Sequence, residues 1–184
     1  RPGLAAPLRE AGPAFAAAPA RPVQRLGGDH ARARAIGRIH EEKVDWLATM
    51  SERLPRKWKP DYRQRMDFLH TVRYEAQRAG LDPQLVLGLI QVESGFRRHA
   101  ISVAGARGYM QVMPFWTRLI GDGDPAGLFD VRTNLRYGCT ILRHYLDIER
   151  GDLFLALGRY NGSRGRAEYP NLVFGARRQW DVRV

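Results

Sequence analysis

Apolar side chains recur at helical rather than strand spacing through most of the chain. Positions three or four residues apart predict helices over residues 29–54, 61–79, 83–94, 114–120, 131–148, 153–160 and 170–180. Clusters of Gly, Pro and Asn separate these segments, and little strand-like alternation is present. The predicted fold class is therefore mostly α.

The spacing also predicts which side chains face inward in the first two helices. In the first helix the expected inner stripe comprises Ile36, Ile39, Leu47, Met50 and Leu54. In the second helix it comprises Met66, Leu69, Val72 and Ala76.

The segment between Asp82 and Gly95 is the most apolar of the predicted helices. Asp82 is a favourable N-cap, a proline follows in the first turn, and Gly95 is a natural stop. Almost no polar side remains, so this helix should be buried all round. Val86, Ile90 and Glu93 lie at positions i, i+4 and i+7, which places a carboxyl group on a buried face.

Two interpretations of Glu93 follow from this helix. Burial disfavours the ionised form of the carboxyl group, the negative end of the helix disfavours it further, and a general acid must be protonated. Alternatively, Glu93 reaches solvent or pairs with Arg97 or Arg98, because structural ion pairs also occur at such positions. The helix alone does not separate the two.

The remaining segments complete the predicted organisation. Residues 1–27 are rich in Ala, Pro and Arg and predict a flexible arm, followed by an N-terminal helix and basic linker over residues 28–60. A helical domain is predicted over residues 61–184. Within it, the Gly-rich stretch after the apolar helix predicts a loop with room for a short hairpin near residues 101–112.

The charge balance is basic, with 30 Lys and Arg against 19 Asp and Glu, a formal net charge of +11. The surplus lies towards the two ends and suits nucleic acid, an anionic membrane or an acidic polymer equally. Cys139 is the only cysteine, which excludes an intramolecular disulfide and favours a buried, inert thiol. No histidine spacing typical of a metal site occurs, and residues 122–124 lack the later ligands of a calcium loop. No cofactor or metal is expected.

Four blocks of the sequence carry a resemblance. Residues 93–96 (Glu-Ser-Gly-Phe), Ser102 and residues 105–114 (Gly-Ala-Arg-Gly-Tyr-Met-Gln-Val-Met-Pro) resemble the catalytic core of the family 1 soluble lytic transglycosylases. Residues 130–138 resemble the family's D-P-x-x-N-[IL]-x-x-G element, and residues 156–162 resemble its A-x-x-x-Y-N-A-G element. Because the blocks follow one another in the family's order, the resemblance is specific.

The resemblance covers about residues 80–175 and has small departures. Tyr109 replaces the usual leucine, Val131 replaces the usual proline, and Ser163 follows the last block. No resemblance covers residues 1–60.

The resemblance implies a lysozyme-like domain with a saccharide groove, and cleavage of the β-1,4 bond between N-acetylmuramic acid and N-acetylglucosamine with a 1,6-anhydro product. It implies that Glu93 acts as both general acid and general base, since the attacking hydroxyl belongs to the substrate. The implied substrate-binding residues are Ser102, Gln111, Met113, Tyr160 and Asn161. The implied supporting residues are Ser94, Phe96, Gly105, Gly108 and Tyr169.

The same resemblance implies a peptidoglycan strand as partner and a periplasmic or cell-wall location in a bacterium. A monomer without a nucleic-acid partner or a transmembrane segment is expected. Two alternatives stay open: a goose-type lysozyme-like hydrolase that uses water, and a non-catalytic peptidoglycan-binding module. The transglycosylase mechanism further requires that no second carboxylate shares the chemistry of Glu93.

Overall fold

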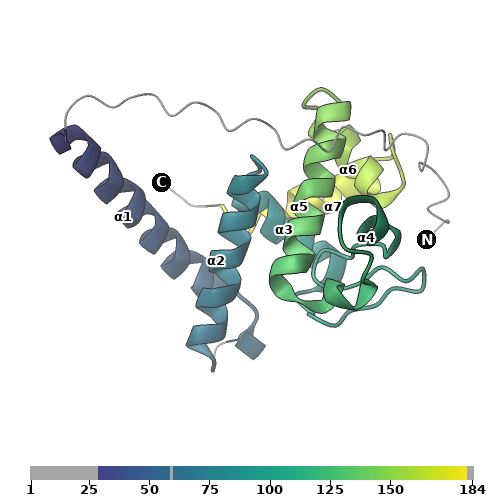
Figure 1. Cartoon of the computed structure of the whole chain (residues 1–184), viewed down its shortest axis with the longest axis horizontal. Helices are drawn as coiled ribbons and strands as arrows, with labels where there is room; N and C mark the ends of the chain where they lie inside the picture. The colour runs from purple at the N-terminus through teal and green to yellow at the C-terminus, as the bar shows by residue number, and fades with distance from the viewer. Residues whose placement is uncertain (1–28, 59, 182–184) are drawn as a thin grey trace. The chain divides into compact units, whose positions relative to one another are not determined.

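The computed structural model describes residues 29–58 and 60–181, which divide into two compact units, residues 29–69 and 70–181 (Figure 1). The boundary between the units lies inside helix α2 (Tyr62–Arg78). The predicted arm lies outside the described residues, and the domain boundaries proposed from the sequence remain predictions.

The first unit is helical. It contains α1 (Asp29–Arg53), the short 3-10 helix η1 (Arg56–Trp58) and the first part of α2. Met50 and Leu54 are buried as predicted, but Ile36 and Ile39 are mostly exposed, so the predicted stripe is wrong in the first half of α1. Helical spacing shows which side chains share a face, and it does not show whether another element covers that face. The ring of Trp58 packs on the ring of Phe68 in α2, with centroids 4.8 Å apart.

The second unit is also built from helices. They are α3 (Pro83–Ser94), α4 (Phe115–Ile120), η2 (Pro125–Phe129), α5 (Val131–Ile148), α6 (Leu153–Asn161) and α7 (Glu168–Arg178). In the described residues the expected hairpin is reduced to two isolated antiparallel bridges, which pair Arg107 with Ile101 and with Val112. The mostly α prediction is confirmed.

Helix α7 begins two residues earlier than predicted. Pro170 lies in its first turn, where the missing N–H group would have no helical partner in any case. The predicted start took Pro170 as the first helical residue. Proline marks the first turn of a helix without fixing which residue of that turn comes first.

Helix α3 packs on α7, α5 packs on η2 and α6, and α6 also contacts α7 (Figure 1). Helices α3 and α7 are very close, because a Cβ atom on Gly88 would lie 2.8 Å from the backbone nitrogen of Arg177. The helices run in opposite directions: Arg177, near the end of α7, donates to the Asp82 cap of α3, whereas Tyr169, near its start, meets Glu93. This pairing fixes the surroundings of the predicted catalytic residue.

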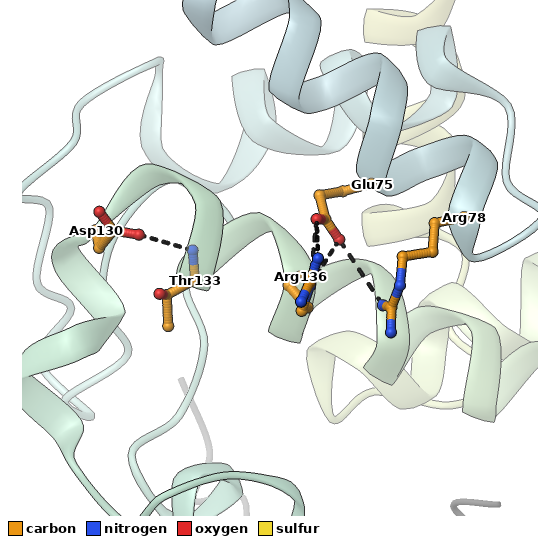
Figure 2. Close-up of polar contacts among 5 residues, drawn as sticks. All are labelled: Glu75, Arg78, Asp130, Thr133 and Arg136. Carbon is orange, nitrogen blue, oxygen red and sulfur yellow. Dashed lines mark hydrogen bonds and ion pairs between the residues drawn. The ribbon is translucent and has the colours of Figure 1, made fainter. Parts of the chain in front are cut away.

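The second half of α2 is joined to α5 by an ion pair between the buried Glu75 and the partly exposed Arg136. The Glu75 carboxylate is 1% exposed and accepts hydrogen bonds from Arg136 Nε at 3.2 Å and from Arg136 Nη2 at 2.9 Å. Arg78 lies on the other side, with its Nη1 3.9 Å from Glu75 Oε2, as Figure 2 shows. Asp130 begins α5 by accepting a hydrogen bond from the Thr133 backbone N–H at 3.0 Å (Figure 2).

Cys139 lies on α5 and is buried, as predicted. Burial raises the pKa of its thiol, and the nearby charge of Glu75 raises it further, so the thiol stays protonated. Among the described helices, none combines the length and the apolar character that crossing a bilayer requires.

Candidate active site

Glu93 lies in the last turn of α3, on the face that the helical spacing predicted to be buried. Its exposed fraction is 9%. The helix closes at Gly95, whose φ of 56° is in the left-handed region that favours glycine. Ser94, the next residue, turns its hydroxyl back to donate to the Ile90 carbonyl at 3.1 Å. The position of Glu93 therefore depends on a well-capped, fully packed helix.

The buried carboxylate of Glu93 receives a neutral donor. The hydroxyl of Tyr169, from the first turn of α7, donates to Glu93 Oε2 at 3.3 Å. The two arginines considered as ion-pair partners direct their Nε donors elsewhere: Arg97 donates to the Ser94 carbonyl and Arg98 to the Phe129 carbonyl, both at 2.9 Å. The Nε donors of both arginines are therefore used elsewhere, and the general-acid interpretation stays a prediction.

Tyr160, at the end of α6, is the second tyrosine near Glu93. Burial raises its pKa well above the ordinary value, and the negative charge of Glu93 raises it further. Its hydroxyl donates to the Met110 carbonyl at 2.7 Å. Tyr160 therefore stays protonated and links the Glu93 environment to the loop that follows α3.

That loop is anchored on α5 by Asn134. The Asn134 amide accepts a hydrogen bond from the Met110 N–H at 2.9 Å and donates to the carbonyls of Arg107 at 2.9 Å and Leu128 at 2.8 Å. A Cβ atom on Gly108 would lie 2.3 Å from Asn134 Nδ2, so the loop can come this close to Asn134 only with a glycine at position 108. Asn134 positions the site and was absent from the predicted site residues. The sequence did contain an indication of its importance, because Asn134 matches the asparagine of the family element at residues 130–138.

Gln111 is buried with its backbone in the left-handed region, at a φ of 51°. Its side-chain Nε2 donates to the Ala100 and Gly108 carbonyls, both at 3.0 Å. Both N–H groups of the amide thus fasten the loop, and they support a backbone conformation that is unfavourable for a residue with a side chain. Any substrate contact of this residue is limited to its Oε1 acceptor.

The other predicted contact residues have local partners. Ser102 Oγ accepts from the Ala106 N–H at 3.0 Å, which leaves the hydroxyl hydrogen available to a ligand. Asn161 Nδ2 donates to Ser163 Oγ at 2.7 Å, which leaves its Oδ1 as an acceptor. Met113 is half-buried just before α4. Tyr169 is thus hydrogen-bonded to Glu93, and Tyr160 is hydrogen-bonded to the loop. The hydrogen bonds of Ser102 and Asn161 stay within their own segments.

Two of the predicted supporting residues act through packing and backbone conformation. Phe96 is buried, and its ring packs on Trp180 with centroids 5.5 Å apart. Gly105 has a φ of 91°, and a Cβ atom there would meet nothing within 4 Å, so it serves the turn rather than a close contact.

Glu149 fastens the segment that carries Tyr160 and Asn161. Its Oε1 accepts from Arg159 Nε at 2.6 Å and from Arg164 Nε at 2.5 Å. These hydrogen bonds, Arg164 first, lower the pKa of Glu149 to about 2. Within the described residues no group of three or more His, Cys, Asp or Glu side chains is arranged to hold a metal ion.

A family model of the transglycosylase SLT domain matches residues 70–180, which is more than half of the chain. The chain belongs to this family. The match confirms the resemblance found in the sequence and supports the lysozyme-like part of the predicted fold class. It covers Glu93, Tyr160 and Tyr169 together with the loop that connects them.

Individual relatives are also named transglycosylases. The chain is 32% identical over 124 residues to the transglycosylase of Enterobacteria phage PRD1, covering 60% of this chain and 45% of that protein. It is 34% identical over 113 residues to the membrane-bound lytic murein transglycosylase C of Haemophilus influenzae strain PittEE, covering 53% of this chain and 32% of that protein. The chain therefore spans less than half of either relative.

Among solved structures, the chain is similar to an inactive mutant of the lytic transglycosylase Slt from Pseudomonas aeruginosa. The TM-score is 0.48 and the identity 29%, with 62% of this chain and 18% of that chain covered.

Proposed function

We propose that this protein is a lytic transglycosylase that cleaves the β-1,4 bond between N-acetylmuramic acid and N-acetylglucosamine in peptidoglycan. The observation that carries the proposal is the buried Glu93 carboxyl group, hydrogen-bonded by the Tyr169 hydroxyl inside the SLT-family region. The relatives named transglycosylase support the reaction class.

The proposed reaction needs one carboxyl group and no water. Protonated Glu93 donates its proton to the glycosidic oxygen as the bond from that oxygen to muramic C1 breaks. The resulting carboxylate then takes the proton of the muramic C6 hydroxyl, whose oxygen bonds to C1 and closes the 1,6-anhydro ring. Glu93 is reprotonated at the end, so the cycle is balanced without a second acid.

The neighbours of Glu93 have complementary roles in this scheme. Tyr169 orients Oε2 and stabilises the carboxylate when the proton has left, because a neutral hydroxyl can donate to it without pairing it permanently. Tyr160 fixes the loop through the Met110 carbonyl. The Ser102 hydroxyl hydrogen and the Asn161 Oδ1 are the groups proposed to hydrogen-bond the sugar, with Met113 as an apolar wall.

The proposed substrate is a peptidoglycan strand, and the proposed location is the periplasm or cell wall. The name of the Haemophilus relative, a membrane-bound lytic murein transglycosylase, supports both. A basic surface is attracted to anionic wall polymers, so wall binding should weaken as salt rises. A monomer without a nucleic-acid partner remains the expectation.

Mass spectrometry of digested peptidoglycan tests this function. The expected products end in 1,6-anhydromuramic acid, which is one water lighter than a hydrolysed end. Products with only reducing ends would show a goose-type hydrolase instead. No products, with saccharide binding retained, would show a non-catalytic binding module.

A further inference from the structure

Trp180 follows the last turn of α7 and is buried against the end of α3. Its indole Nε1–H donates to Gln91 Oε1 at 2.9 Å. Its ring packs on the ring of Phe96, with centroids 5.5 Å apart and the two planes tilted by 56°. Gln91 precedes Glu93 by two residues, and Phe96 follows Glu93 by three. Trp180 therefore holds the chain on both sides of Glu93.

The turn that follows Glu93 has a backbone conformation that a phenylalanine does not favour. Gly95 and Phe96 have φ angles of 56° and 60°, both in the left-handed region. Glycine adopts this region freely, whereas a residue with a Cβ atom does so at a cost. Such a conformation persists only where the surrounding structure fixes it. Phe96 is buried, and the ring of Trp180 is part of the packing that fixes it.

Gln91 links the same turn to the indole of Trp180. The Gln91 carbonyl accepts a hydrogen bond from the Gly95 N–H at 3.0 Å, which closes α3. The Gln91 side chain accepts from Trp180 through Oε1 and donates through Nε2 to Gln179 Oε1 at 3.0 Å. Because an indole N–H can only donate, it determines which end of the Gln91 amide faces it. Gln91 is thus held at its backbone and at both ends of its amide group.

We propose that Trp180 is a positioning residue for Glu93 and acts through Gln91 and Phe96. The inference rests on the proposed function, which assigns both proton transfers to Glu93. A general acid must lie within hydrogen-bonding reach of the glycosidic oxygen, and a displacement of about 1 Å lowers the rate steeply. Tyr169, in the first turn of α7, contacts the carboxyl group, and Trp180, beyond the last turn, fixes the backbone around it. The two ends of α7 therefore hold the same acid.

A double-mutant cycle on the hydrogen bond between Trp180 and Gln91 tests this role. Trp180→Phe keeps an aromatic ring against Phe96 and removes the donor, and Gln91→Leu removes the acceptor at a similar side-chain size. Each variant should lower kcat by about threefold, with KM within about twofold because the groups proposed to bind the sugar are unchanged. The double variant should be no slower than the slower single variant, since both changes remove the same contact.

Trp58→Phe is the matched control. Trp58 is buried like Trp180 and packs on Phe68 in a similar tilted arrangement, and it lies outside the SLT-family region. Its kcat and KM should be those of the wild type. Circular dichroism gives the melting temperature of each variant, and the release of anhydro products well below that temperature gives kcat and KM. This comparison separates a loss of positioning from a loss of folded protein.

The possible outcomes distinguish the inference from the proposed function. Unchanged kcat in both single variants, or losses that add in the double variant, would overturn the positioning role. A raised KM at unchanged kcat would also overturn it and would assign Trp180 to substrate binding. A wild-type protein that cleaves no peptidoglycan would instead refute the proposed function, and the inference with it. A non-additive fall of kcat in the Trp180 and Gln91 variants, with the Trp58 control unaffected, supports the inference.

Discussion

Two buried glutamates of the same unit differ in the partners that surround them. Glu75 is 1% exposed and accepts three hydrogen bonds from the guanidinium group of Arg136. Glu93 is 9% exposed and accepts a hydrogen bond from the neutral hydroxyl of Tyr169. Burial is therefore common to the two side chains, and the hydrogen-bond donors described for them differ. Glu75 is contacted by a cationic guanidinium group, and Glu93 is contacted by a neutral phenol hydroxyl.

The two surroundings also suit different tasks. A carboxylate held bidentately by arginine joins α2 to α5, which is a structural task. The task proposed for Glu93, which lies at the end of α3 beside Tyr169, is proton transfer. The following predictions test this difference.

The largest expected effect is on catalysis at Glu93. Glu93→Gln should lower the rate of anhydro-product formation by about 10³-fold, because the amide can neither donate nor accept the transferred proton. Its melting temperature should stay close to that of the wild type. Turnover is measured by chromatography of released muropeptides and melting by circular dichroism. An equal rate of wall digestion by the variant would refute the role of Glu93.

Glu75→Gln is the matched control and should show the opposite pattern. Removing the charge leaves Arg136 without its partner and should lower the free energy of unfolding by about 1–3 kcal/mol, less than for a fully buried pair because Arg136 is 46% exposed. The folded fraction should retain the wild-type kcat. Urea unfolding gives the stability. A variant that keeps its stability but loses turnover would place Glu75 in the chemistry and contradict the single-acid mechanism.

Tyr169→Phe should reduce kcat by roughly tenfold, the value of one hydrogen bond of about 1.4 kcal/mol. The ring and its packing are preserved, so KM and stability should change little. A loss as large as that of Glu93→Gln would mean that Tyr169 itself transfers a proton. No loss would mean that the 3.3 Å contact does not persist in the reaction.

The sequence predicted one of these glutamates and missed the other. The position of Glu93 follows from local rules, since the Asp82 cap, the helical period and Gly95 together define its face. The pairing of Glu75 with Arg136 joins residues 61 positions apart, and no local pattern encodes which surfaces of two helices meet. The same limit explains the exposed Ile36 on α1.

The loop shows a further limit. The sequence identified Gln111 from a motif and predicted a sugar contact, but its two N–H groups are used by the Ala100 and Gly108 carbonyls. Those contacts exist only because the chain folds back with Gln111 in a left-handed conformation, which few residues other than glycine adopt. Motif positions predicted the residues of the candidate site, and the distribution of hydrogen bonds among them required the structure.

The smallest expected effect is on acid stability and concerns Glu149, which like Glu75 is held by arginine. Its pKa is lowered from 4.5 to about 2, so its ion pairs contribute stability that is fully present above pH 4.5 and is lost as the pH falls towards 2. Glu149→Gln should therefore melt at a lower temperature than the wild type at pH 6, and the difference should shrink on acidification to pH 2.5. Melting curves across this range, compared between the two proteins, isolate the contribution of Glu149 from that of other carboxylates. A difference that stays constant with pH would mean that the side chain stabilises the segment around Tyr160 by packing, and Glu149 would then not belong with Glu75 among the arginine-paired carboxylates.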